Sequence, residues 1–418
     1  MIPRLYQAAT LIATPSVMAY CLGRKDLRQG VWRRFWPQKV VGSTYGRHIW
    51  IHAASAGEVR LANHFAKEFL KSESRTEFLL TTNTRTGVAA SMEGPWMTAR
   101  LFPFDNALAV NRLFDSFSPQ AVLTIELELW PGLIMEARNR KIPFFAINAR
   151  MGKEKRDTYY RLNRTLDNFL GYPYFLTRSD TDFEQFRDLG IPIDHLLITG
   201  EMKVDMMEYA IKAIPEARRN LLLGVSTHEG EEKILLQSYL ELKKSYPELK
   251  LALAPRHVRR SHDVEKEARS YGLRVKLVKP EDRVTGNDAE VFIENGFGRI
   301  NEWLALSRIA FVGGSLVDRG GHNVLEPLLA GVPVLTGPFH HRWAQWVTLL
   351  DDEGVLSVVK DAQDISRVSA IAMDQPQEMM RAIRRAQERV NQHRGSTQRN
   401  LGLIQQILRG EDPFALAT

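Results

Sequence analysis

The chain has 418 residues, of which 44% are hydrophobic and 25% are charged, and this composition excludes a fibrous or largely disordered protein. Its net charge of +7 favours anionic partners, such as a phosphorylated substrate, acidic lipid or nucleic acid. The single cysteine, Cys21, excludes an internal disulfide framework and any cysteine-based metal site. A chain of this length is expected to form two domains.

The amino-terminal segment, residues 1–40, predicts a membrane anchor. The stretch LYQAATLIATPSVMAYCLG carries no charge, although Pro15 and several small polar residues make it marginal for crossing a bilayer. Basic residues and tryptophans follow between Arg24 and Trp36, which is typical of an anchor that faces the cytoplasm. The alternatives are a signal peptide cleaved near LIATPSVMA and a buried amphipathic helix.

From residue 48 onward, short apolar runs alternate with helix-like stretches. HIWIHAA, TEFLLTTNT, AVLTIELE and PFFAINAR predict strands, and a second such series begins at LLLGVST. Alternating strands and helices indicate parallel strands joined by right-handed crossovers. The predicted fold class is therefore α/β, with two Rossmann-like doubly wound domains at residues 41–208 and 209–385. Residues 386–418 predict a basic helical segment, and the sequence does not assign it to either domain.

Polar motifs directly follow the predicted strands. SAGEVR follows HIWIHAA, ELELWPG follows AVLTI, STHEGEE follows LLLGV, and PRH follows LALA. Carboxyl ends of parallel strands meet at one edge of a sheet, where ligands bind in open α/β folds. We therefore expect these loops to face one another across an interdomain cleft and to form a binding site.

Three acidic residues in these loops are candidates for chemistry. Glu58 lies in the first turn of a predicted helix, where it is either a favourable helix start or a general base. Glu126 and Glu128 interrupt an apolar run, and burying an unpaired carboxylate is costly. At least one of the two is therefore expected in the site, unless a neighbouring arginine pairs with it.

The stretch GGSLVDRGGHNVLEP follows the predicted strand IAFV and opens a predicted helix with a possible Asn cap. This arrangement indicates an anion or nucleotide cradle. Arg256 and His257 of PRH suit a phosphate or a carboxylate. The spacing of His228, Glu229 and Glu231 matches no metal signature, so no metal is expected. GxxxxGK[ST], GxGxxG and GxSxG are absent, which disfavours NTP hydrolysis and dinucleotide redox chemistry.

These motifs, together with TTNTRTG, NAR and GEMKVD, occur in the order and approximate spacing of one family. The chain resembles the 3-deoxy-D-manno-octulosonic acid (Kdo) transferases over nearly its whole length. The resemblance implies a GT-B glycosyltransferase that transfers Kdo from CMP-Kdo to a lipid A precursor in lipopolysaccharide biosynthesis, at the cytoplasmic face of the inner membrane. It implies an acceptor-binding amino-terminal domain, a donor-binding carboxy-terminal domain and no cofactor besides the donor.

The resemblance also implies roles for particular residues. Glu58 matches the general base of the family, and Glu126 matches a second carboxylate that the family needs. The implied donor-binding positions are Lys203, Ser226, Arg256, His257, Gly298, Gly314, Ser315, Asn323 and Glu326.

Three departures from the family pattern bear on the substrates. VWRRFW, which contains Arg33, replaces G-E-R-x-G; Arg299 replaces the Glu of G-E-L; and FHHRW, which contains Arg342, replaces H-T-F-N-F. They leave open a divergent GT-B enzyme that uses another nucleotide sugar or acceptor, and a noncatalytic membrane-tethered binding protein. Nucleic-acid binding is not expected, because no recognition module is present.

Overall fold

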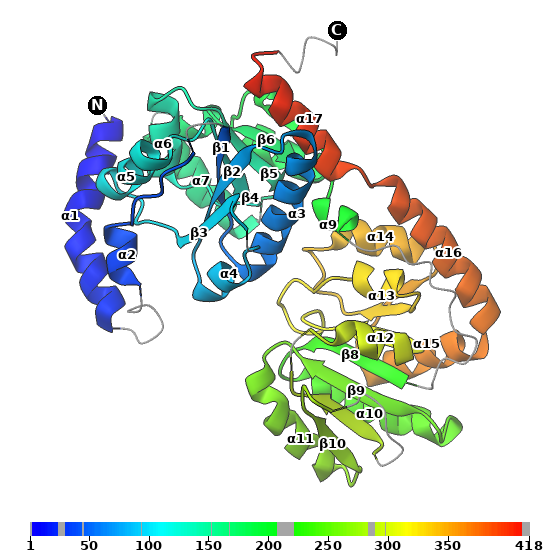
Figure 1. The fold of residues 1–418 in the computed structure, drawn as a ribbon. Helices are drawn as coiled ribbons and strands as arrows, with labels where there is room; N and C mark the ends of the chain where they lie inside the picture. Colours follow the sequence, from blue (N-terminus) through cyan, green and yellow to red (C-terminus); the bar gives the residue numbers. More distant parts are fainter. Residues whose placement is uncertain are drawn as a thin grey trace. The chain divides into compact units, whose positions relative to one another are not determined.

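The computed structural model describes residues 2–23, 30–43, 46–92, 94–151, 153–166, 168–206, 221–282, 289–296 and 298–411. The chain divides into two compact units, each with its own sheet (Figure 1). Unit 1 comprises Met1–Met206 and His393–Thr418, and unit 2 comprises Met207–Gln392. The predicted boundary between residues 208 and 209 lies outside the described residues.

Unit 1 contains a seven-stranded sheet of order β3-β2-β1-β4-β5-β6-β7, in which every pair is parallel. Its strands are β1 (Arg47–His52), β2 (Thr76–Thr82), β3 (Met97–Leu101), β4 (Ala121–Ile125), β5 (Phe144–Ala149), β6 (Tyr174–Thr177) and β7 (Leu196–Ile198). Its helices after the amino-terminal pair are α3 (Ala56–Ser72), α4 (Arg85–Ala89), α5 (Ala107–Phe117), α6 (Pro131–Asn139), α7 (Lys153–Thr165), α8 (Asp180–Asp188), α9 (Met202–Asp205) and α17 (Ser396–Leu408), with 3-10 turns η1 (Phe169–Gly171) and η2 (Ile193–His195).

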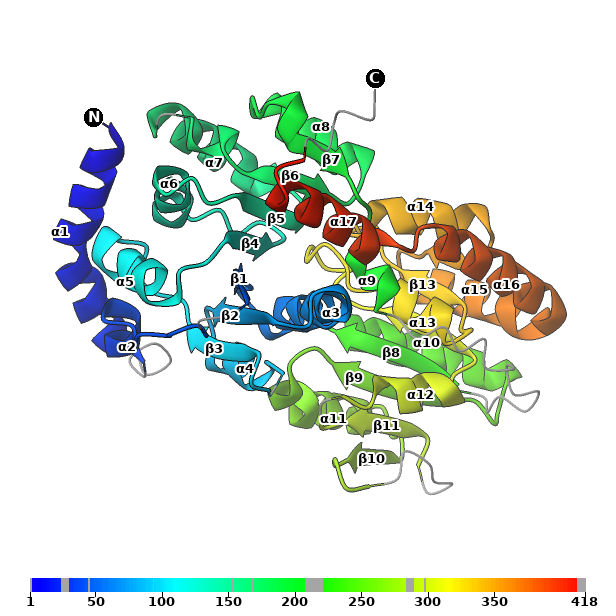
Figure 2. The same cartoon turned by 45° about the horizontal axis from the view of Figure 1, so that its top comes forward.

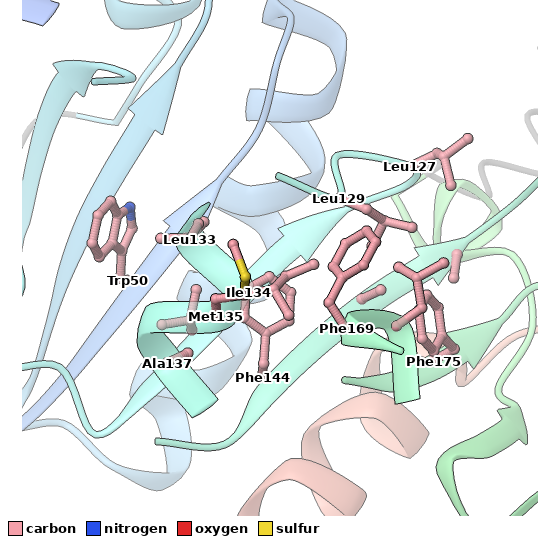
Figure 3. Packing of buried hydrophobic residues seen from close by; sticks show 14 of the residues in the cluster. Trp50, Leu127, Leu129, Leu133, Ile134, Met135, Ala137, Phe144, Phe169 and Phe175 are labelled. Atoms are coloured by element: carbon pink, nitrogen blue, oxygen red, sulfur yellow. The ribbon is translucent and has the colours of Figure 1, made fainter. Parts of the chain in front are cut away.

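Both faces of this sheet are buried, which explains why its strands read as continuous apolar runs. Successive side chains of β1 point to opposite faces, so Trp50 enters one hydrophobic cluster while Ile49 and Ile51 enter the other. Figure 3 shows the Trp50 cluster, in which Phe144 and Phe169 pack around side chains of α6. The parallel strands predicted from the sequence are confirmed here.

The amino-terminal helix α1 (Ile2–Gly23) lies beside α5 and α6 and packs against α2 (Val31–Phe35) (Figure 1). Hydrogen bonds join α1 to the rest of unit 1. Tyr6 Oη donates to Asp105 Oδ2 at 2.9 Å, and Asn106 Nδ2 donates to Thr14 Oγ1 at 3.1 Å. Among the helices that the structure describes, none is both long and apolar enough to cross a membrane.

Unit 2 contains a second parallel seven-stranded sheet, of order β10-β11-β9-β8-β12-β13-β14. Its strands are β8 (Leu221–Thr227), β9 (Lys250–Pro255), β10 (Val275–Val278), β11 (Val291–Glu294), β12 (Ile309–Val312), β13 (Val334–Thr336) and β14 (Leu356–Val358). Its helices are α10 (Glu231–Ser245), α11 (Ser261–Ser270), α12 (Ile300–Leu306), α13 (Leu325–Leu329), α14 (Ala344–Asp352), α15 (Ala362–Asp374) and α16 (Pro376–Gln392), with the 3-10 turn η3 (Val258–Arg260). The strand order reverses between β8 and β12, which is where ligands bind in open α/β sheets.

The carboxy-terminal segment is divided between the two units. Helix α16 packs on unit 2, where Gln387 Nε2 donates to the carbonyl of Leu328 at 2.9 Å. Helix α17 returns to unit 1 and lies beside α3 (Figure 2), with Leu401 in the core that also holds Ile49 and Ile51. Asp205 fixes the start of α17, because its carboxylate accepts the N–H of Gly395 at 2.8 Å and that of Thr397 at 2.6 Å.

Candidate functional site

Glu126 lies directly after β4, where the backbone has a positive φ of 59°. Its side chain is buried, and each carboxylate oxygen meets a cation: Lys203 Nζ lies 2.8 Å from Oε1, and Arg150 Nη2 lies 2.6 Å from Oε2. Burial raises the pKa of Glu126, but Lys203 and Arg150 outweigh burial and lower it to about 2. Glu126 is therefore a fixed negative charge at neutral pH. Lys203, which was expected among the donor-binding residues, lies in unit 1 and pairs with this carboxylate.

Glu128 contacts a different set of side chains. Trp130 Nε1 donates to its Oε2 at 3.0 Å, and the Nε2 of His52 lies 3.4 Å from the same oxygen. His52 ends β1 and is fully buried, with Nδ1 3.0 Å from the carbonyl of Thr81. Burial lowers the pKa of His52, which Glu128 opposes. The sequence analysis did not predict His52 or Trp130 here, because they lie 78 residues apart in the chain.

Glu58 lies in the first turn of α3, which Ser55 caps by accepting the N–H of Glu58. The Glu58 carboxylate reaches back and accepts the N–H of Ala54 at 2.7 Å and the Ser55 hydroxyl at 3.1 Å. Burial raises the pKa of Glu58, and the negative charge of Glu126 raises it further, to about 7. The predicted helix start and the predicted general base are compatible, because the capping contacts hold in place a carboxylate that titrates near neutral pH.

In unit 2 the corresponding edge of the sheet is organised by Glu231. This carboxylate is fully buried and accepts backbone N–H groups at 2.8–2.9 Å, from His228, Gly314, Ser315 and Leu316. It therefore joins the loop after β8 to the loop after β12, across the point where the strand order reverses. The N–H groups of Gly314 and Ser315, two of the predicted donor-binding positions, are already satisfied by this contact.

A basic cluster lies at the same edge and consists of His228, Arg256, His257, His322 and Arg342. The Nε2 atoms of His228 and His322 are 2.9 Å apart, and their rings stack with centroids 5.2 Å apart. The ring of His257 meets that of His228 edge-on at 5.8 Å. Burial lowers the pKa of His322, and the charges of Arg256 and Arg342 help to bring it to about 4. The cluster thus combines two guanidinium charges with imidazoles that donate or accept hydrogen bonds.

Similarity to known proteins identifies the family. A family model described as 3-deoxy-D-manno-octulosonic-acid transferase (kdotransferase) matches residues 28–206. The 3-deoxy-D-manno-octulosonic acid transferase of Haemophilus influenzae is 30% identical over 376 residues, which cover 86% of this chain and 87% of that protein. The chain belongs to the Kdo transferase family. The Kdo transferase of Aquifex aeolicus is also similar, with 28% identity over 80% of this chain and 88% of that protein.

The predicted fold class is supported by a solved structure as well. A glycosyltransferase from Rickettsia africae superposes with a TM-score of 0.60 at 11% identity, covering 87% of this chain and 99% of that chain. A likeness at this identity concerns the fold alone. The two parallel-sheet α/β units thus confirm the predicted fold class, and neighbours of GT-B type share this fold.

The other positions that the family resemblance implied fall at the same edge of unit 2. Ser226 is the penultimate residue of β8 and has a positive φ of 54°. Asn323 Oδ1 accepts the N–H of Leu325, the first residue of α13, at 3.0 Å, and this helix is only five residues long. Glu326 lies in its first turn and is half-buried. A Cβ built on Gly298, whose φ is 83°, would have no atom within 4 Å, so the surface there is open.

The three arginines at which the chain departs from the family pattern lie in different surroundings. Arg33 is exposed, while its neighbour Arg34 donates to the carbonyls of Phe102, at 3.1 Å, and Asn83. Arg299 is buried and donates to the carbonyls of Lys279 and Asp282, at 2.6 Å each, so it supports a loop. Arg342, in contrast, is exposed within the basic cluster.

Proposed function

We propose that this chain transfers Kdo from CMP-Kdo to a lipid A precursor in lipopolysaccharide biosynthesis, with Glu58 as the general base. Membership of the family supports Kdo transfer. The observation that supports the base is the placement of Glu58, whose carboxylate is positioned by Ala54 and Ser55 and has a pKa of about 7. A base of this pKa is suited to accept a proton at neutral pH.

In the proposed reaction an acceptor hydroxyl attacks the anomeric carbon of Kdo. The new C–O bond forms as the hydroxyl proton passes to Glu58, and the bond to the CMP phosphate breaks with its electron pair leaving on the phosphate. Arg256 and the neighbouring members of the basic cluster would bind that phosphate. The donor has a single phosphate, so we propose no metal to bridge a diphosphate and no further cofactor.

We further propose that the amino-terminal helices bind the cytoplasmic face of the inner membrane. Large apolar side chains are exposed there, including Ile12 at 79% and Trp32 at 61%. Basic residues lie close by in the chain, at Arg33 and Arg34. Exposed apolar and interfacial aromatic side chains together with cations are typical of a surface that lies on an anionic membrane.

A divergent enzyme that uses another nucleotide sugar remains the second candidate, because two family positions in unit 2 carry arginine here. At Arg299 the side chain is directed to the carbonyls of Lys279 and Asp282, so a carboxylate that the family presents is replaced by a buried cation.

Transfer is tested with the full chain in detergent, CMP-Kdo generated during the assay and a tetraacylated lipid A precursor, with mass spectrometry of the lipid. The wild type should add Kdo, and Glu58→Gln should lower the rate by about 10²–10⁴-fold. Glu68→Gln, on the same helix, is the control and should retain activity. An active Glu58→Gln variant refutes the general base. A folded wild type that binds CMP without transferring Kdo favours the second candidate.

Membrane binding is tested separately by flotation with vesicles of phosphatidylethanolamine and phosphatidylglycerol. The wild type should float with the vesicles, and Trp32→Ser combined with Ile12→Ser should reduce the floating fraction. Phe339→Ser is the matched control, because Phe339 is an exposed aromatic side chain of unit 2. Equal flotation of all three proteins would contradict membrane docking through the amino-terminal helices.

A further inference from the structure

Arg342 lies in the loop after β13, and its backbone is held by a hydrogen bond to the loop after β12. Its N–H donates to the carbonyl of Gly320 at 3.1 Å. A Cβ on Gly320, whose φ is +81°, would lie 2.9 Å from Arg342 Cγ, so the arginine stem passes directly over a residue with no side chain. Glycine suits both the positive φ and this close approach. A side chain at position 320 would therefore strain the backbone and force the side chains of Arg342 and His341 to shift.

The loop that carries Arg342 is itself anchored. Gly337 N–H donates to the hydroxyl of Ser315 at 2.8 Å, and Phe339 N–H donates to the Ser315 carbonyl at 2.9 Å. Ser315 in turn donates its N–H to the buried carboxylate of Glu231. Hydrogen bonds through Ser315 therefore connect the loop that carries Arg342 to the buried carboxylate of Glu231.

The guanidinium of Arg342 carries an uncompensated charge. Neither Arg256 nor Arg342 forms an ion pair with a carboxylate in the part of the chain that the structure describes. The nearby carboxylate of Glu231 accepts backbone N–H groups with both oxygens. With a pKa of about 4, which both arginines help to lower, His322 is neutral at pH 7. Such a site favours a ligand with two anionic groups.

The strand order separates the strands that lead to the two arginines. Arg256 follows β9 and Arg342 follows β13, while β8 and β12 lie between them. CMP-Kdo carries its phosphate and its carboxylate on the same anomeric carbon, so its two negative charges are neighbours. The open surface at Gly298, beyond β9 and next to β11, is the expected nucleotide end. The sugar then lies toward β13.

We propose that Arg342 binds the carboxylate of the donor sugar, while Arg256 binds the phosphate. This inference rests on the proposed function. Arg342 then selects a sugar acid over a neutral sugar, because a planar guanidinium pairs with a carboxylate through two parallel hydrogen bonds.

The test compares Arg342→Gln with the wild type by two measurements, the KM for CMP-Kdo in the transfer assay and the Kd for CMP alone by calorimetry. The variant should raise the KM for CMP-Kdo about 10- to 100-fold, the loss of one charge-assisted contact. Its Kd for CMP should stay near the wild-type value, since CMP lacks the carboxylate. Arg367→Gln, which removes an exposed arginine of α15, is the control and should change neither.

Equal weakening of CMP-Kdo and CMP would overturn the inference and assign Arg342 to the phosphate. An unchanged KM in a folded variant would overturn it as well and leave Arg342 a surface residue. Failure of the wild type to bind CMP would instead overturn the proposed donor, and this is distinguishable because it appears without any substitution.

Discussion

Replacing Glu58 by glutamine should stabilise the protein at alkaline pH, although it removes the proposed general base. Glutamine keeps an oxygen that can accept the N–H of Ala54, so the capping contact of α3 is retained. It also removes an ionisable group whose pKa is raised from 4.5 to about 7 by burial and by Glu126. The carboxylate of Glu58 therefore destabilises the fold once it is ionised.

The sign of this pH effect follows from the linkage between proton binding and folding. The folded carboxyl binds its proton more tightly than the unfolded one, so wild-type stability falls as pH rises from about 4.5 to about 7 and is then constant. At 1.36 kcal/mol per pKa unit the full loss is about 3 kcal/mol, and solvent screening of this half-buried group reduces it to about 1–3 kcal/mol. Glu58→Gln does not suffer this loss.

The assay is chemical denaturation of both proteins at pH values of about 5 and about 8.5, followed by tryptophan fluorescence. The variant should exceed the wild type in unfolding free energy by about 1–3 kcal/mol at the higher pH and by less than about 1 kcal/mol at the lower pH. An equal difference at both pH values, or a wild type that is more stable than the variant at the higher pH, would refute the reasoning.

Three further predictions follow from the same contacts. The kcat/KM should rise with pH and level off above about 7, as Glu58 loses its proton, whereas a flat profile below that pH would exclude Glu58 as the base. Lys203→Met should lower the unfolding free energy by about 1.5–3 kcal/mol in denaturant titrations, because Glu126 loses one of its two cations; no change would mean that Arg150 alone suffices. Glu231→Gln should lower the unfolding free energy by about 2–6 kcal/mol and abolish CMP binding in calorimetry, because an amide cannot accept all four N–H groups. Normal CMP affinity of the variant would contradict the role of Glu231 in organising the donor-binding loops.

The carboxylates of Glu58 and Glu126 illustrate how much a local sequence pattern can predict. Glu58 was predicted from its place in the first turn of a helix that follows a strand, and the structure has that helix with Ser55 as the cap. The sequence left open whether Glu126 pairs with an arginine. It does so with Arg150 and also with Lys203, a residue 77 positions away that no local pattern connects to it.

The carboxy-terminal segment shows a different limit. A basic helical segment was expected over residues 386–418, but a helical sequence pattern does not indicate which of two cores a helix packs on. The structure places α16 on unit 2 and α17 on unit 1, and the carboxylate of Asp205 fixes the crossing by accepting N–H groups near residue 396.

The sequence by itself determined the two parallel sheets, the loops at their carboxyl ends and the family, because strand runs, glycine turns and spaced motifs are local in the chain. Only the tertiary structure decided which polar groups meet in those loops. Glu231 binds N–H groups some 83 to 85 residues away, and His228 meets His322 across 94 residues. Such pairs form because parallel strands distant in the chain end at one edge of a sheet, and the strand order that brings them together is a property of the folded core.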